Sequence, residues 1–141
     1  MSMEVRLSLS LPRDRSTVPL TRRVLDSALA VFSVTKDCRA DIGLAVGEAC
    51  ANAVQHAESG ADYHVTVTIL EDRCVIDVID DGIGVSAVHA EGPEPGPDDE
   101  SGRGLRIIRA LADAVELKTG DPRGAAVRIV KFLSRTAPAP A

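Results

Sequence analysis

One segment, from Asp37 to about Ala57, constrains the fold of this chain more than any other feature. Asp37 is a suitable N-cap for a helix over this range. Apolar residues point in nearly every direction around such a helix: Ile42, Leu44, Ala45, Val46, Ala49, Cys50, Ala51, Ala53 and Val54. A helix that is apolar almost all round is buried on most sides. The rest of the chain therefore has to cover it.

The other segments supply five strands and two more helices. Alternating apolar and polar residues predict strands, and apolar residues at helical spacing predict helices. Strands are expected over 5–11, 63–70, 73–80, 115–118 and 125–132, and the further helices over 17–32 and 102–114. The order β-α-α-β-β-α-β-β predicts an α/β (α+β) fold, with a mixed, mainly antiparallel sheet and helices on one face.

Two segments have no periodic pattern. Residues 86–101 combine glycine, proline and acidic residues, and a long loop of this kind inside a compact domain is typically functional. We expect this loop to act as a lid over a ligand. Residues 136–141 alternate alanine and proline and are expected to form a disordered tail. The remaining chain, 1–135, is predicted to be a single domain.

Composition argues against several classes of partner. The net charge is −5, the pI is about 5.1 and aromatic residues make up 2% of the chain, which disfavours nucleic acids and anionic membranes. The three cysteines include no closely spaced pair, so we expect buried free thiols in a reducing compartment. No apolar run reaches membrane-spanning length. These features predict a soluble, cytoplasmic protein.

A narrow polar stripe interrupts the apolar helix. Glu48, Asn52 and His56 are spaced four residues apart and so share one helical face. One interpretation is that this face simply meets solvent. The other is that the stripe lines a cleft, where the Asn52 amide oxygen would ligate Mg²⁺ together with substrate phosphates. Glu48, one turn earlier, would accept a proton from an attacking hydroxyl or orient a water.

The third predicted strand ends in Asp80, followed by Gly82 and Gly84. A carboxylate accepts hydrogen bonds, and the exocyclic amine of adenine donates them. Two glycines around one apolar residue let the backbone approach a flat ligand closely. The motif therefore suits adenine, although a plain Asp-Gly turn would look the same.

A second glycine motif, Gly102-Arg103-Gly104-Leu105, opens the last predicted helix. Free backbone N–H groups and the positive end of the helix dipole make such a start a suitable phosphate site. A glycine-rich cap after a flexible loop is the simpler alternative. The phosphate loop of Walker-type nucleotide-binding proteins is absent from the sequence.

Taken together and in this order, the three motifs resemble the histidine kinase and Hsp90-like ATPase superfamily, which has the Bergerat ATP-binding fold. Residues 48–52 resemble its N box, residues 80–84 its adenine box, and residues 102–105 its later glycine box. The resemblance covers about residues 5–133. It implies an α/β two-layer sandwich that binds ATP with Mg²⁺.

Within that superfamily the chain resembles bacterial anti-sigma-factor serine/threonine kinases. The resemblance implies that Glu48 is the general base, that Asn52 ligates magnesium and that Asp80 binds the adenine amine. It also implies that the pocket is shaped by the remaining motif residues: His56, Gly82, Gly84, Gly102, Arg103, Gly104 and Leu105.

Proteins of this class bind a sigma factor, phosphorylate a serine on an antagonist (anti-anti-sigma) protein, and commonly form homodimers. Two alternatives remain open from the sequence. One is an ATP-binding regulatory module without kinase activity, which is favoured by Ala125, where the family often has threonine. The other is a histidine-kinase catalytic domain, which would require a preceding pair of phosphoacceptor helices and a different residue pattern at Glu48.

Overall fold

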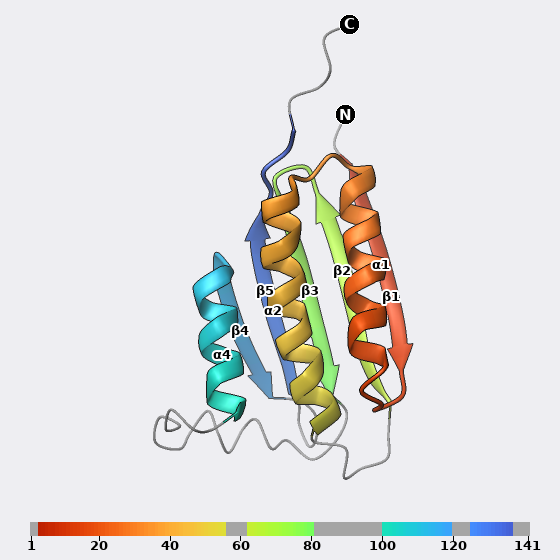
Figure 1. Ribbon diagram of the computed structural model, residues 1–141, viewed down its shortest axis with the longest axis vertical. Helices are drawn as coiled ribbons and strands as arrows, with labels where there is room; N and C mark the ends of the chain where they lie inside the picture. Colours follow the sequence, from red (N-terminus) through yellow and green to blue (C-terminus); the bar gives the residue numbers. More distant parts are fainter. Residues whose placement is uncertain (1–2, 56–61, 81–99, 120–124, 137–141) are drawn as a thin grey trace, which may run out of the picture.

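The computed structural model describes residues 3–55, 62–80, 100–119 and 125–136 (Figure 1). Its elements follow the predicted order. They are β1 (Glu4–Leu11), α1 (Thr17–Val31), α2 (Lys36–Gln55), β2 (Tyr63–Leu70), β3 (Arg73–Asp80), α4 (Glu100–Leu111), β4 (Ala114–Thr119) and β5 (Ala125–Phe132).

The strands form one five-stranded sheet in the order β1-β2-β3-β5-β4. Every pairing among these strands is antiparallel. The sequence predicted a mixed, mainly antiparallel sheet, and the described strands include no parallel pair. Strand β1 lies at one edge, and this explains why Val5, Leu7 and Leu9, predicted to face a core, are only partly buried, whereas Leu11 is buried in the core. The predicted α+β fold class is confirmed.

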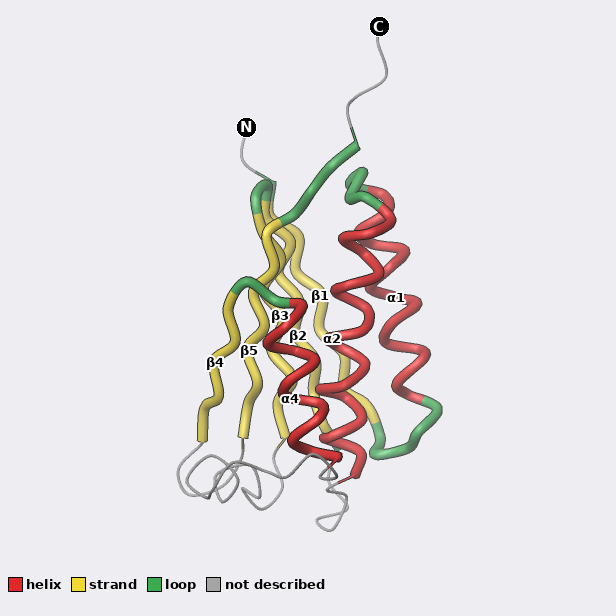
Figure 2. Tube along the Cα trace, turned by 60° about the vertical axis from the view of Figure 1, so that its left-hand side comes forward, coloured by secondary structure: helices red, strands yellow, loops and turns green. Residues whose placement is uncertain are grey.

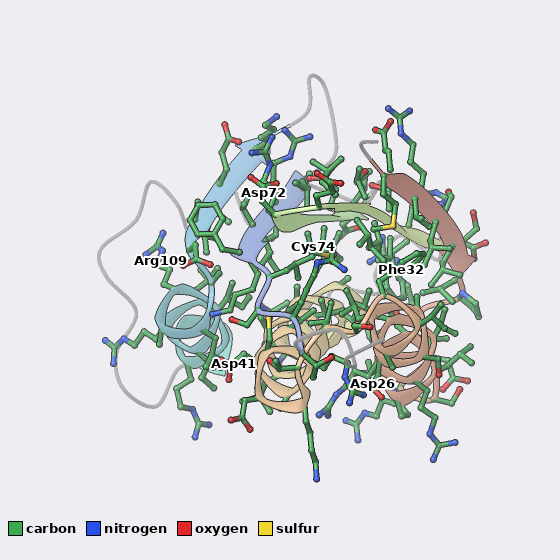
Figure 3. The ribbon with its side chains drawn as sticks, turned by 90° about the horizontal axis from the view of Figure 1, so that it is seen from above. Asp26, Phe32, Asp41, Asp72, Cys74 and Arg109 are labelled. Atoms are coloured by element: carbon green, nitrogen blue, oxygen red, sulfur yellow. The ribbon has the colours of Figure 1, made fainter. Side chains whose placement is uncertain are left out.

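The described helices all lie on one face of the sheet, and no described helix covers the other face, which is called the uncovered face below (Figures 2 and 3). Helix α2 packs between α1 and α4 and also contacts β3 and β5. Its inward residues, among them Ile42, Val46 and Cys50, are almost completely buried against Ile76 and Ile129 of the core. The prediction that this helix is covered on most sides is confirmed.

The boundaries of the last helix differ from the prediction. Helix α4 begins at Glu100, so the final two residues of the loop predicted over 86–101 are helical. The helix ends at Leu111, and Asp113 then accepts a hydrogen bond from the backbone N–H of Phe132 at 2.6 Å, which ties the start of β4 to β5.

Thr136, the first residue of the predicted tail, is bonded to the rest of the fold. The backbone N–H of Thr136 donates to the carbonyl of Ser33 at 2.8 Å, so this residue is held against the end of α1. Residues 137–141 lie outside the described part. Among the described helices, none is both long and apolar enough to cross a membrane.

Candidate functional site

The predicted site residues that the structure describes lie toward one end of the molecule. The C-terminal ends of β1, β3 and α2 and the N-terminal ends of α1 and α4 all lie at the lower end of Figure 1. This placement follows from the topology, because β3 and α2 run in the same direction while α4 runs back. Motifs that are far apart in the sequence therefore share one end of the fold.

Glu48 and Asn52 are half-buried on α2 and face the first turns of α4. A Cβ atom placed on Gly104 would lie 3.2 Å from the Asn52 amide nitrogen and 3.2 Å from a Glu48 carboxylate oxygen. Glycine costs a helix interior about 0.5–1 kcal/mol relative to alanine, yet it permits this close approach. The polar stripe therefore faces another helix, which does not fit the alternative of a fully solvated face.

A pocket of about 270 Å³ opens beside these two residues. It is lined by Glu48, Ala51, Asn52, Gln55, Arg103 and Ile107. The lining thus combines a carboxylate, two carboxamides and a guanidinium, a set suited to a phosphate group with a bound cation. The volume is just below the usual range for sites that hold a complete small ligand.

Arg103 and Leu105 of the last glycine motif lie in different surroundings. Arg103 is exposed and contributes to the pocket wall. Leu105, which was expected at the pocket edge, packs against the hydrophobic core, and Ile107 takes the apolar place in the lining. The reason is helical geometry: residues 103 and 107 share one face of α4, whereas 105 points toward a different side.

Asp80 lies at the end of β3 on the helix-covered face, with a side chain that is 15% exposed. Its carboxylate is paired with the guanidinium of Arg13, which comes from the connection between β1 and α1. Arg13 also donates to the carbonyl of Ala53 in the last turn of α2, at 2.6 Å. Asp80 is thereby linked to the segment that carries Asn52.

The sequence did not single out Arg13. The segment 12–16 reads as a polar break, and the partner of Arg13 lies 67 residues away. A basic residue two positions after a strand is a weak local signal, and it does not indicate which carboxylate it meets. This residue is the main addition that the structure makes to the predicted set.

A buried hydroxyl cluster supports this end of the sheet. Tyr63, which opposes Asp80 across β2 and β3, is completely buried, and its hydroxyl lies 2.6 Å from that of Thr17. Thr17 in turn donates to the carbonyl of Asp14 at 2.6 Å, so Tyr63 is the donor in their pair. The start of α1 is therefore bonded to the strand next to Asp80.

The three cysteines are buried free thiols, as expected. Burial raises the pKa of Cys50 and of Cys74 to about 12, and nearby hydrogen bonds from Tyr63 and Thr21 only partly oppose this shift at Cys50. Both thiols therefore stay protonated at neutral pH and pack as small apolar groups.

Several predicted site residues lie outside the described part of the chain. His56, Gly82 and Gly84 belong to this group, as does the proposed lid except for its last two residues. Gly102 is described and lies in the first turn of α4.

Comparison with known families places this fold in a class of ATPase domains. Residues 11–131 match the family model described as the histidine kinase-like ATPase domain, and the chain belongs to this family. The expected use of ATP follows from this membership.

Particular relatives narrow the class. The chain is 31% identical to serine-protein kinase RsbW of Halalkalibacterium halodurans, over 92% of this chain and 84% of that protein. It is 28% identical to the anti-sigma F factor of Caldanaerobacter subterraneus, over 81% of this chain and 84% of that protein. The predicted resemblance to anti-sigma-factor serine/threonine kinases is confirmed.

Two solved structures share the fold. One contains the RsbU and RsbW domains of Rv1364c from Mycobacterium tuberculosis, with a TM-score of 0.72 and 22% identity; the match covers 94% of this chain and 34% of that longer chain. The other is the SiaB–SiaC complex of Pseudomonas aeruginosa, with a TM-score of 0.67 and 17% identity over 88% of both chains.

Proposed function

We propose that this chain is an ATP-dependent serine/threonine kinase that phosphorylates an antagonist protein and binds a sigma factor. The observation that carries the proposal is the meeting of Glu48 and Asn52 with the glycine-containing start of α4. This arrangement would bring a proton acceptor and a neutral oxygen ligand together in one pocket beside α4.

In the proposed reaction the hydroxyl oxygen of the partner's serine bonds to the γ-phosphorus of ATP. The bond from that phosphorus to the bridging oxygen breaks, and ADP leaves. Glu48 accepts the hydroxyl proton. Such a transfer depends mainly on positioning and on charge stabilisation, so a rigid helix is a suitable carrier for Glu48.

The donor set of the pocket fits magnesium-bound phosphates. Mg²⁺ is held in proteins by a few oxygen ligands together with phosphates and waters, and Asn52 offers one such oxygen. The ion would neutralise charge on the phosphates. Arg103, exposed at the pocket wall, would bind a phosphate oxygen directly.

Asp80 would accept a hydrogen bond from the adenine amine at the other side of the same end of the fold. The backbone near Gly102 and Gly104 would approach the phosphates, and Gly82, Gly84 and His56 would complete the pocket. The names of the relatives, a serine-protein kinase and an anti-sigma F factor, support a sigma factor as a partner and a protein serine as the phosphorylated group. We further propose that the chain forms a cytoplasmic homodimer. Its partners would be proteins, with no direct binding to nucleic acids or membranes.

A transfer assay tests the proposal. The chain is incubated with magnesium and γ-labelled ATP, together with a purified antagonist (anti-anti-sigma) protein. We expect a labelled serine on that antagonist. Glu48→Gln should retain ATP binding and lose transfer by about 10²–10⁴-fold, because only the proton acceptor is removed. Asp77→Asn, on the uncovered sheet face, is the matched control and should transfer normally.

The alternative function is an ATP-binding regulator that transfers nothing. Tight binding of magnesium and ATP by the wild type, with no label on the antagonist under any condition, would favour that alternative. Equal transfer by wild type and Glu48→Gln would instead remove Glu48 from the role of base.

A further inference from the structure

We propose that Arg13 is a positioning residue of the nucleotide site, which orients the carboxylate of Asp80 toward adenine and fixes it relative to the end of α2. This inference rests on the proposed function, because it assumes that Asp80 meets the adenine amine. It adds a residue that belongs to none of the three sequence motifs.

Arg13 links the end of β3 to the last described turn of α2. Its side chain is 4% exposed, which is unusual for arginine. One terminal nitrogen donates to the carbonyl of Ala53 at 2.6 Å, and the other pairs with Asp80. The planar guanidinium holds its two donors in a fixed geometry, so the position of Asp80 relative to α2 becomes defined.

The surroundings of Arg13 suit a permanent cation. The carbonyl of Ala53, which accepts a hydrogen bond from Arg13, lies in the last described turn of α2. Carbonyls toward the C-terminal end of a helix favour positive charge. Displacing the Arg13 guanidinium would deprive the buried carboxylate of Asp80 and the carbonyl of Ala53 of this donor. We therefore do not expect ligand binding to displace the guanidinium.

The backbone that carries Arg13 is itself held in place. The N–H of Asp14 donates to the carbonyl of Pro12 at 2.8 Å, and the N–H of Thr17 donates to the carbonyl of Asp14 at 3.0 Å. Thr17 is further bonded to Tyr63, the neighbour of Asp80 across the sheet. The turn and the strand end therefore form one connected unit.

Pairing with Arg13 leaves Asp80 chemically able to read adenine. A carboxylate has two oxygens and about four acceptor positions, so it can bind a guanidinium and still accept from an exocyclic amine. The orientation of the Asp80 carboxylate decides which of its two oxygens faces the adenine amine. Loss of Arg13 should therefore weaken selection for the amine more than it weakens binding of the phosphates.

The test compares ATP with inosine triphosphate, which carries a carbonyl in place of the adenine amine. Both are titrated with magnesium into the full chain by calorimetry. The variants are Arg13→Gln and Arg13→Lys, and the matched control is Arg128→Gln, which removes the partner of Asp77 on the uncovered face. Circular dichroism confirms that each variant is folded.

We expect Arg13→Gln to weaken ATP binding about tenfold, the effect of one lost charge-assisted hydrogen bond, and to leave inosine triphosphate nearly unchanged. Arg13→Lys should fall between Arg13→Gln and wild type, and remains informative if Arg13→Gln does not fold. Arg128→Gln should bind both nucleotides as wild type does.

Three results would overturn the inference. An equal loss for both nucleotides would show that Arg13 only supports the fold, and tighter ATP binding by the variants would show that it blocks the site. A wild type that prefers ATP while both Arg13 variants keep the full preference would remove Arg13 from nucleotide selection. Absence of ATP binding by the wild type is a different failure, because it contradicts the proposed function itself.

Discussion

Strand β3 carries two aspartates that pair with arginines on opposite faces of the sheet. Asp77 lies on the uncovered face and is bonded to Arg128 of the adjacent strand β5, at 2.8 and 3.1 Å. Asp80 lies on the helix-covered face and is paired with Arg13. The side chains of the first pair are 21% and 39% exposed, whereas those of the second are 15% and 4% exposed.

The comparison shows that an aspartate–arginine pair contributes differently to stability on the two faces of the sheet. Hydrogen bonds and attraction to Asp77 raise the pKa of Arg128, but water still screens this pair. The Arg13 pair is largely removed from water, so neither charge can lose its partner cheaply. Asp77 is therefore a local cross-strand contact, and Asp80 is part of the connected end that carries the candidate site.

The largest expected difference concerns folding stability. Asp80→Ala leaves the buried guanidinium of Arg13 without its anion and should lower the free energy of unfolding by about 3–5 kcal/mol. Asp77→Ala should lower it by at most about 1 kcal/mol, because its partner remains hydrated. Urea denaturation of both variants measures the difference. Equal losses would break the distinction between the two faces.

The close approach of α4 gives the next prediction. Gly104→Ala places a methyl group 3.2 Å from atoms of both Glu48 and Asn52, so these side chains must shift. We expect phosphoryl transfer to fall roughly tenfold, because small misplacements are costly in catalysis. Gly43→Ala on α2 is the control, since its nearest neighbour would be Arg22 at an ordinary 3.8 Å. Similar activities for the two variants would contradict the proposed contact.

The buried thiols of Cys50 and Cys74 should make the chain less stable at alkaline pH. Cys50 and Cys74 have pKa values of about 12 in the folded chain and ordinary values near 9 when unfolded. Between these values the folded state holds protons that the unfolded state has released, so stability falls as pH rises. The slope should be about 1.4 kcal/mol per pH unit for each thiol.

Denaturation of wild type and Cys74→Ala between pH 9 and 10 isolates one thiol. The variant should be less stable overall because of the lost packing, but its stability should fall less steeply with pH. Parallel slopes would show that the Cys74 thiol is not held protonated by burial.

The smallest effect is expected for the exposed pair itself. A double-mutant cycle on Asp77 and Arg128 should give a coupling of about 0.2–1 kcal/mol, and added salt should reduce it. A coupling that exceeds this range and does not change with salt would mean that the uncovered face is shielded, for example by a second copy of the chain.

The sequence predicted those parts of the molecule that depend on local pattern. The element order follows from periodicity, and the shared face of Glu48 and Asn52 follows from their spacing of four residues. The approach of Gly104 to both residues could not be derived, because it depends on how α4 packs on α2. The role of Arg13 was missed for the same reason, since a single sequence does not indicate that residues 13 and 80 meet.

The most direct test of the account is a calorimetric titration of ATP into the folded chain with and without magnesium. The account predicts one ATP bound per chain, with affinity that depends on magnesium. Asn52→Ala should remove the dependence on the metal, and Asp80→Asn should weaken binding about tenfold, since an acceptor oxygen is replaced by a donor. No binding by the well-folded wild type, or undiminished binding by both variants, would contradict the claim that these residues form one nucleotide site.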